Sequence, residues 1–338
     1  MASTKPLPIS GPVVGDEPGS SEEPVLRLGV SSCLLGEEVR FDGGHKRDRF
    51  LLASLGPYVK WFPICPELEM GLGVPRESLR LTGKVASPRL TAPRSGADHT
   101  EAMQDWSRER LEQLVDLDLH GYVLKRASPS CGLFRVKVYG KNNIPQHDGR
   151  GIYAAELMDR FPLLPVEEEG RLHDAHLREN FIERLFAHER WKRFLREDPT
   201  PAGLVQFHTG QKLTLMAHSP AHYRNLGRLV ADLRRQPFES LLQDYKSGFF
   251  EGLGKIASRG RHVNVLQHVL GFLKQKLPAE HKAEMTELIE DYRHGLVPLV
   301  VPVTLLRHHL RFHDVDPWIL QQSYLRPYPK ELMLRNHV

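Results

Sequence analysis

The chain has 338 residues and carries 46 Lys and Arg against 42 Asp and Glu, for a formal net charge of +4. Hydrophobic residues make up 40% of the chain and charged residues 26%, which is typical of globular proteins. No apolar run approaches the ~20 residues that a membrane-spanning helix requires, so a membrane-spanning protein is excluded. The length exceeds one ordinary domain and predicts two cores of about 150 residues each.

The beginning of the chain and its cysteine content predict the cellular setting. Residues 1–24 are rich in Pro, Gly, Ser and Glu and lack a basic start followed by an apolar stretch. This pattern predicts a disordered leader rather than a signal or transit peptide. Cys33, Cys65 and Cys131 are the only cysteines, and an odd, widely spaced set disfavours a disulfide framework. We expect a cytoplasmic protein.

The first part of the chain predicts strands that alternate with helices. In chain order we expect a strand over 25–30, a helix over 48–55, a strand over 59–64, a helix over 100–119, a strand over 121–125 and a helix over 151–158. Each of the three cysteines follows the carboxyl end of one strand. In an open, mostly parallel α/β sheet those ends line one ligand crevice, so we expect the three thiols to meet there.

A domain boundary is expected where Pro162 and Pro165 precede an acidic run and Gly170. We assign residues 25–165 to the first domain and 171–338 to the second. The second has helical patterns without a strand signal of comparable strength, which predicts an all-α domain. Its expected helices cover 180–196, 202–216, 222–234, 238–253, 261–277 and 280–295.

Charge is divided unevenly between the two halves. Residues 171–338 hold 25 Lys and Arg against 18 Asp and Glu, a net charge of +7, whereas the rest of the chain has a net charge of −3. The basic half also contains 14 of the 18 histidines. A basic module beside a catalytic module favours a polyanionic substrate such as RNA, although +7 is also compatible with an ordinary charged surface.

The cysteines themselves are candidate metal ligands. Three thiolates leave one coordination position free for a substrate, which favours a catalytic metal centre over a structural one. The spacing lacks the close Cys-x2-Cys pairs of zinc ribbons, so free buried cysteines are the alternative. Small, proline and hydroxyl residues flank every cysteine, and such loops leave sulfur accessible and supply backbone donors.

Three groups of residues carry a resemblance to a known family. They are Ser31-Ser32-Cys33-Leu34-Leu35-Gly36 with Arg40-Phe41-Asp42-Gly43-Gly44, Cys65-Pro66-Glu67 with Gly71-Leu72 and Pro75-Arg76, and Lys125 with Ser128-Pro129-Ser130-Cys131-Gly132. Together they resemble the TudS-type thiouracil desulfidase family over residues 25–145. The resemblance implies a 4Fe-4S cluster held by Cys33, Cys65 and Cys131, with the fourth iron open to the sulfur of a thiocarbonyl.

The second half resembles the YbgA-like domain, on Gln206-Phe207-His208, Lys212, Leu215-Met216-Ala217-His218-Ser219-Pro220, His222-Tyr223, Arg224 and Gly227-Arg228. In two-domain proteins of this combination, the resemblance implies desulfidation of 4-thiouridine in tRNA. The helical domain is then a candidate tRNA-binding module.

The expected chemistry is hydrolytic and needs no electron transfer. Water adds to the thiocarbonyl carbon with Glu67 as general base, and oxygen replaces sulfur. Ser128 and Ser130 are candidate catalytic donors to the ring or to a developing oxyanion. The alternatives are a surface carboxylate for Glu67 and a serine-rich turn for the two hydroxyls.

Further polar residues of the first domain are candidate substrate contacts: Ser32, Arg40, Asp42 and Lys125. Arg40 and Asp42 have the alternative of pairing with each other in a turn, and Lys125 that of an exposed charge at a strand end.

In the second domain, the candidate RNA contacts are Lys212, His222, Tyr223, Arg224 and Arg228. They combine phosphate-binding cations with an aromatic ring for stacking, although a polar network between helices would use the same residue types. His218 and His222 have helical i, i+4 spacing, but Pro220 lies between them, so we favour a turn over a metal site.

Three other functions are compatible with these residues. A desulfidase of free thiouracil or thionucleosides would use the helical domain for oligomerisation. A cluster-bearing sensor or RNA-binding protein would need the cysteines without turnover. A structural zinc domain with reactive cysteines would be colourless, whereas an iron–sulfur protein is brown.

Overall fold

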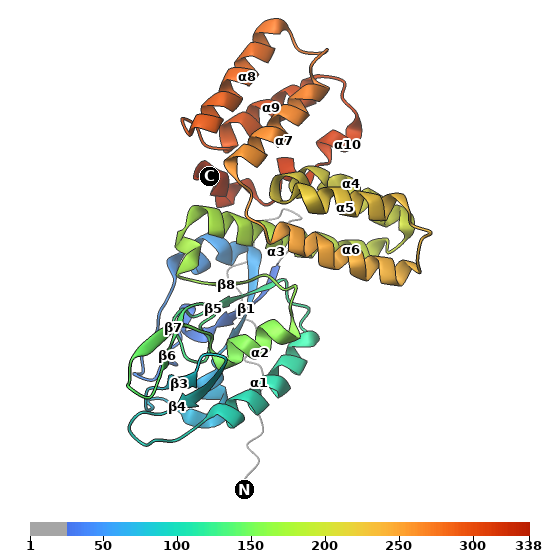
Figure 1. Ribbon diagram of the computed structural model, residues 1–338. Helices are drawn as coiled ribbons and strands as arrows, with labels where there is room; N and C mark the ends of the chain where they lie inside the picture. The colour runs from blue at the N-terminus through green and yellow to red at the C-terminus, as the bar shows by residue number, and fades with distance from the viewer. Residues whose placement is uncertain (1–25) are drawn as a thin grey trace. The chain divides into compact units, whose positions relative to one another are not determined.

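A computed structural model describes residues 26–338, so the predicted leader lies outside the described residues. The chain divides into two compact units between His173 and Asp174 (Figure 1). The first unit combines strands and helices and the second is helical, which confirms the predicted fold class.

One of the two sheets of the first unit is fully parallel, and we call it the parallel sheet. Its strands are β1 (Leu26–Ser31), β2 (Val59–Ile64), β5 (Gly121–Leu124) and β8 (Val166–Glu168), in the order β2-β1-β5-β8. Leu28 of β1 pairs with a residue of β2 on one side and a residue of β5 on the other. All four residues of β5 are buried, as expected for a central parallel strand covered on both faces.

Helices α1 (Thr100–Val115) and α2 (Ile152–Arg160) lie side by side in this unit (Figure 1). Helix α1 ends earlier than predicted, and Asp118 just beyond it has a left-handed φ of 50°. The helix predicted over 48–55 is present but shorter, and Phe50–Leu55 has π-helical instead of α-helical hydrogen bonding. A 3-10 turn over Gly56–Tyr58 follows at once, and β2 begins at Val59.

A second sheet, which we call the mixed sheet, was not predicted. It contains β3 (Arg80–Lys84), β4 (Ser87–Thr91), β6 (Val136–Tyr139) and β7 (Pro145–Gly149), in the order β4-β3-β6-β7. Its two antiparallel hairpins come from different connections of the parallel sheet and join through parallel pairing of β3 with β6. These strands are short, and glycine, proline and charged residues interrupt them, so their sequence shows no alternating pattern.

Strand β8 occupies the acidic run that the sequence analysis read as a boundary. The carboxylate of Glu168 is buried and accepts hydrogen bonds from the backbone N–H groups of Leu133 and Phe134 at 2.8 and 3.1 Å. Glu167 accepts a bond of 2.7 Å from Nε of Arg171. These partners allow acidic residues to lie in an edge strand of the sheet.

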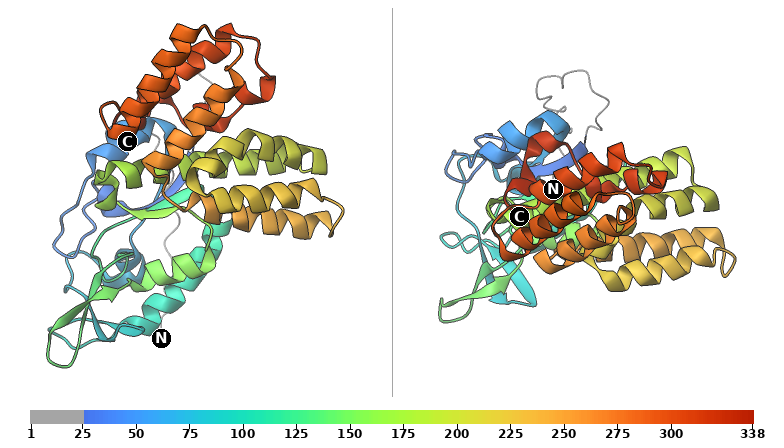
Figure 2. Two further views of the ribbon diagram at one scale, coloured as in Figure 1. Left: turned by 45° about the horizontal axis from the view of Figure 1, so that its top comes forward. Right: turned by 90° about the horizontal axis from the view of Figure 1, so that it is seen from above.

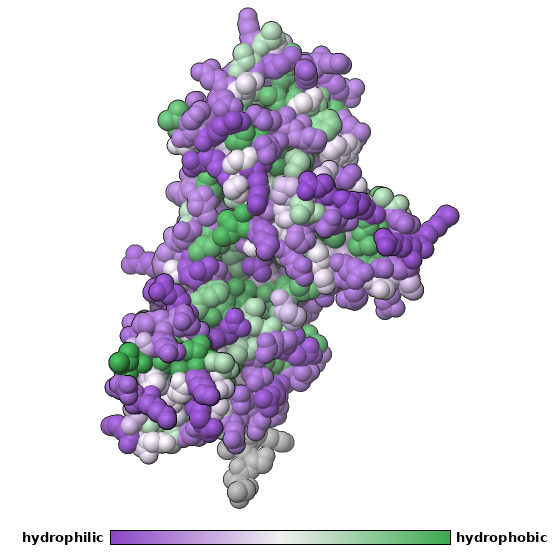
Figure 3. All heavy atoms as spheres, viewed as in Figure 1, coloured by the Kyte–Doolittle hydropathy of each residue, from purple (hydrophilic) through white to green (hydrophobic). Residues whose placement is uncertain are grey.

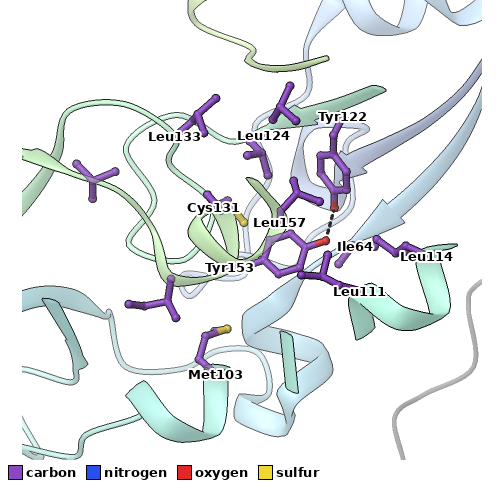
Figure 4. Packing of buried hydrophobic residues seen from close by; sticks show 14 of the residues in the cluster. Ile64, Met103, Leu111, Leu114, Tyr122, Leu124, Cys131, Leu133, Tyr153 and Leu157 are labelled. Carbon is purple, nitrogen blue, oxygen red and sulfur yellow. Dashed lines mark hydrogen bonds between the residues drawn. The ribbon is translucent and has the colours of Figure 1, made fainter. Parts of the chain in front are cut away.

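The core of the first unit extends to the cysteine loops. Figure 4 shows Tyr122 and Tyr153 joined by a hydroxyl hydrogen bond of 3.2 Å, with Cys131 among the surrounding aliphatic side chains. The ring of Tyr122 packs directly on Gly29 of β1, because a Cβ at position 29 would lie 2.2 Å from its carbon atoms. The sheet therefore needs a residue without a side chain at position 29.

The variant Gly29→Ala should lower the free energy of unfolding by about 3 kcal/mol, since the new methyl group displaces a fully buried ring. Urea denaturation measures this change. Gly140→Ala is the control, because the nearest atom to its new Cβ would lie 3.9 Å away. Equal denaturation midpoints for the two variants would contradict the packing described.

The second unit contains α3 (Ala175–Glu197), α4 (Pro201–His218), α5 (Pro220–Ala231), α6 (Phe238–Leu253), α7 (Arg259–Phe272), α8 (Ala279–His294), α9 (Val300–Phe312) and α10 (Pro317–Leu320). The six predicted helices correspond to α3–α8: α6 has the predicted ends, whereas the ends of the other five are shifted. Helices α9 and α10 were not predicted. Ser219 separates α4 from α5 and accepts a bond from the N–H of His222. None of the helices in the described part of the chain is long and apolar enough to cross a membrane.

Two cores hold the helices of the second unit. Aromatic rings of α3, α4 and α6 pack around Trp191, with Phe207 and Tyr245 at 5.3 and 5.7 Å between ring centroids. Helices α7, α8 and α9 bury a separate, mainly aliphatic cluster. Figure 2 shows the two corresponding groups of helices from two further directions.

Candidate functional site

The three cysteines line one cavity of about 250 Å³ at the carboxyl edge of the parallel sheet. Cys33 follows β1 within a single 3-10 turn, Cys65 follows β2 directly, and Cys131 lies in the loop after β5. The parallel order of the strands brings together side chains that are 32 and 66 residues apart in the sequence. The thiols therefore share one crevice.

Cys33 and Cys131 are buried and Cys65 is half-buried. Burial raises the pKa of Cys33 to about 12 and that of Cys65 to about 11, and it also raises the pKa of Cys131. A charge on Cys65 adds to the upward pKa shift of Cys33, and charges on Cys65 and Cys33 add to that of Cys131. As free thiols the three side chains would thus be neutral, and a bound metal would be required to hold them as thiolates.

Glu67 lies in the wall of the cavity and is held by two partners. Arg76 donates from Nε and Nη2 to Oε2 at 2.9 and 2.7 Å, and Ser130 donates from its hydroxyl to Oε1 at 2.9 Å. Arg76 is fixed in turn by the carbonyl groups of Val39 and Gly73 at 3.0 and 2.9 Å. The carboxylate thus has a defined orientation, and Glu67 is not the surface residue that the alternative interpretation expected.

The two candidate serines occupy different positions. Ser128 lines the cavity, and its Oγ accepts bonds from the N–H groups of Ser130 and Cys131 at 3.2 and 3.1 Å. Both acceptor positions of that hydroxyl are then used, which leaves its proton for a bond to another acceptor. Ser130 is fully buried and is not part of the cavity wall, so its contact is with Glu67 instead of with a substrate.

The candidate substrate-binding residues separate into two groups. Ser32, Arg40 and Lys125 line the cavity. Lys125 pairs with Glu169 and donates to the carbonyl of Arg126 at 3.0 Å. Asp42 is not in the cavity wall: it lies exposed, 3.3 Å from Arg40, and accepts a bond from the N–H of Gly44. The structure therefore favours the turn interpretation for Asp42.

Sequence reasoning missed three residues of the site. Ser31 lines the cavity and accepts a bond from the N–H of Lys125 at 2.9 Å, which ties the first cysteine loop to the third. Phe41 lines the cavity with 39% of its surface exposed. Arg76 holds the carboxylate of Glu67. Phe41 and Arg76 both stand in the motifs that carry the family resemblance, but the contact between Arg76 and Glu67 was not predicted.

The candidate RNA contacts of the second unit do not form one cluster. Arg224 and Arg228 are exposed one turn apart on α5. His222 shares a bond of 2.7 Å with the hydroxyl of Ser219, and Tyr223 is half-buried. Lys212 of α4 has its ammonium group 5.6 Å from the ring of Trp318.

His218 and His208 are buried and form hydrogen bonds between helices of the second unit. His218 is buried, with Nε2 at 2.9 Å from Glu183 and Nδ1 at 2.6 Å from the carbonyl of Lys255. Burial lowers its pKa, but the charge and hydrogen bond of Glu183, the Lys255 carbonyl and the charge of Glu179 together raise the pKa by more. His208 contacts the hydroxyl of Tyr245 at 3.0 Å. Within residues 26–338, no group of three His, Cys, Asp or Glu side chains is arranged around a single metal ion.

Two family models match the chain. The 2-thiouracil desulfurase family matches residues 28–169, which include all three cysteines and both sheets. A family described as a protein of unknown function, DUF1722, matches residues 212–329.

Two curated relatives and one solved structure are similar to parts of the chain. The uncharacterized protein YbgA of Escherichia coli (strain K12) is 30% identical over 154 residues, which are 45% of this chain and 90% of that protein. The uncharacterized protein YbbK of Bacillus subtilis (strain 168) is 32% identical over 108 residues, 30% of this chain and 71% of that protein. A solved [4Fe-4S]-dependent thiouracil desulfidase, TudS, is 28% identical with a TM-score of 0.35 and covers 44% of this chain and 93% of its own. The chain therefore belongs to the families of its two curated relatives, with a 2-thiouracil desulfurase domain in its first half and a YbgA-like DUF1722 domain in its second.

Proposed function

We propose that the chain converts 4-thiouridine in tRNA to uridine, with water supplying the oxygen and sulfur leaving as hydrosulfide. The family assigns desulfidation of thiouracil-type substrates to the first unit. The observation that carries the proposal is the cavity in which three cysteines meet the oriented carboxylate of Glu67. The reaction exchanges a C=S bond for a C=O bond and needs neither oxidant nor reductant.

A 4Fe-4S cluster is the cofactor that we infer for this cavity, held by Cys33, Cys65 and Cys131. The donor set fits this group, since cluster iron is bound by cysteine thiolates, one to each iron, and the three thiols surround a shared space instead of a single point. When bound, the cluster would supply a Lewis-acidic iron without a protein ligand, which is suited to a soft thiocarbonyl sulfur.

Glu67 is the proposed general base. One lone pair of Oε1 receives the Ser130 hydroxyl and Oε2 receives Arg76, so the remaining lone pair of Oε1 is available for a proton from water. Ser130 and Arg76 are positioning residues, because they act on the carboxylate and not on the substrate. Deprotonated water then adds to the thiocarbonyl carbon.

The other cavity residues have proposed roles in binding the pyrimidine. The free hydroxyl proton of Ser128 can be donated to an oxygen or nitrogen of the ring, worth about 3 kcal/mol if the bond strengthens as negative charge develops. Ser32, Arg40 and Lys125 would contact polar edges of the base. Phe41 offers an exposed ring on which the base can stack.

The helical unit, residues 171–338 in the proposed division, would contribute contacts to tRNA, for which Arg224 and Arg228 are the most exposed candidates. We propose that the protein acts in the cytoplasm, where thiolates persist and tRNA is present.

Nucleoside analysis tests the function. The protein, purified without air and loaded with iron and sulfide, is incubated with tRNA containing 4-thiouridine or with free 4-thiouracil. We expect 4-thiouridine to decrease and uridine to increase by the same amount. Turnover of the free base alone would support the small-molecule desulfidase, which the cavity volume of about 250 Å³ also accommodates. No turnover of either substrate would contradict a desulfidase.

A further inference from the structure

A second cavity of about 730 Å³ adjoins the cysteine cavity in the first unit. Both cavities are lined by Leu79, Arg126, Ala127 and Pro129, so these residues form the boundary between them. Strands β3, β6 and β7 of the mixed sheet provide much of the wall of the second cavity. A ligand that filled this second cavity would therefore extend to the entrance of the proposed active site.

Basic side chains dominate the wall of this second cavity, which we call the basic groove: Arg80, Arg126, Arg135, Lys137, His147 and Arg171. Among the described residues that line it, Glu168 is the only one with a carboxylate, and its Oε1 already accepts two backbone N–H groups. In the described part of the chain, the side chains of Arg126, Arg135 and Lys137 form no salt bridge with a carboxylate. The groove thus has unneutralised positive charge suited to a polyanion.

The pairing within the mixed sheet explains why these charges face outward together. Along β6, Val136 and Val138 are buried in the core, whereas Lys137 between them is exposed. Leu81 of β3 pairs with Val138 and is also buried, so the adjacent Arg80 points to the same outer face as Lys137. Figure 3 shows mostly hydrophilic residues, with a few hydrophobic spots, over the region of these strands.

Aromatic rings alternate with the cations. The guanidinium group of Arg171 lies 4.5 Å from the ring centroid of Phe134, and that of Arg80 lies 5.1 Å from the ring of Tyr139. Phe134 has 38% of its surface exposed. A positively charged groove with interleaved aromatic side chains is the arrangement by which proteins bind unpaired nucleic acid strands.

We propose that the basic groove binds the phosphodiester backbone of the RNA strand next to the thiolated nucleotide, while the base of that nucleotide enters the cysteine cavity. This inference rests on the proposed function and extends it. The catalytic unit then contributes its own contacts to the RNA. A free base or nucleoside has no neighbouring phosphates and cannot form these contacts.

The test uses the double variant Arg135→Gln/Lys137→Gln, because neither residue lines the cysteine cavity. The matched control is Lys84→Gln/Arg94→Gln, which removes two exposed charges of the same unit outside both cavities. Fluorescence anisotropy measures binding of a labelled single-stranded RNA containing 4-thiouridine across a range of salt concentrations. Turnover of free 4-thiouracil is measured in parallel on the loaded proteins.

We expect the groove variant to bind the RNA roughly 10- to 100-fold more weakly, with the slope of log Kd against log salt reduced by about 2. Free 4-thiouracil should be consumed at the rate of the unmodified protein, and the control should bind RNA within about twofold of it. Equal RNA affinity in groove variant and control would overturn the inference. The same holds for a parallel loss of free-base turnover.

The two proposals can fail separately. RNA binding that depends on the groove, together with absence of turnover, would refute the desulfidase and retain the groove. Desulfidation of RNA that is unchanged in the groove variant would retain the enzyme and refute the groove.

Discussion

Replacing Cys131 with alanine should remove both the cofactor and the desulfidation of every substrate. The three thiols line one cavity, and a cluster with only two of its three thiolates loses a bond to an iron. Changing a residue that merely supports a metal ligand costs about 10- to 100-fold in affinity or activity, so loss of a ligand itself should exceed that range. Iron content, visible absorbance and nucleoside analysis of the protein purified without air measure the effect.

Two control measurements on the same variant, its unfolding and its binding of RNA, show whether the protein remains folded. Cys131 is buried in the core of the first unit, so its removal also leaves a small cavity worth about 1 kcal/mol. We expect cooperative unfolding to persist and the anisotropy with RNA to match that of the unmodified protein. Unchanged iron content with full activity would rule out Cys131 as a ligand.

Glu67→Gln should retain the cluster and lose turnover, with kcat lower by about 10²- to 10⁴-fold. The amide keeps the size of the side chain and an oxygen that can accept from Arg76, but it cannot take a proton from water. Single-turnover kinetics with 4-thiouracil, alongside absorbance of the cluster, separates the two properties. A cluster-bearing sensor without catalysis would predict no functional change in this variant.

Ser130→Ala distinguishes positioning from catalysis at the same carboxylate. Loss of its hydrogen bond to Oε1 of Glu67 should lower kcat about tenfold, leave KM unchanged and shift the pH profile of kcat. Ser107→Ala is the matched control, because Ser107 is equally buried in α1, outside the cavity wall. The same loss in both variants would mean that the effect is structural.

The parallel sheet and the meeting of the three cysteines could be predicted from sequence. Strands over 25–30 and 59–64 are runs of apolar residues that end beside a cysteine, and parallel pairing makes strand ends coincide in space. The contacts that orient Glu67 could not be predicted. Ser130 lies 63 residues away from it, and Arg76 reaches it only because the chain folds back after Gly73.

The basic groove could not be predicted from the net charge of each half of the chain. That same comparison of net charges favoured the helical half as the RNA-binding part. Residues 1–170 have a net charge of −3, yet Arg80, Arg126, Arg135 and Lys137 lie around one cavity there. Net charge records how many charges a segment has and not where they face. Their common orientation depends on β3 pairing with β6, and neither strand has a sequence signal of its own.

The parallel pairing of β3 with β6 also has a mechanical consequence. Only four residues, 132–135, separate Cys131 from β6, and the turn that contains Cys131 is fastened by the bond from Gly132 N–H to the carbonyl of Ser128 at 2.8 Å. The chain that follows Cys65 leads through Arg76 into β3. A force applied to the outer face of the mixed sheet would therefore be transmitted to two of the three cysteine loops at once, those of Cys65 and Cys131.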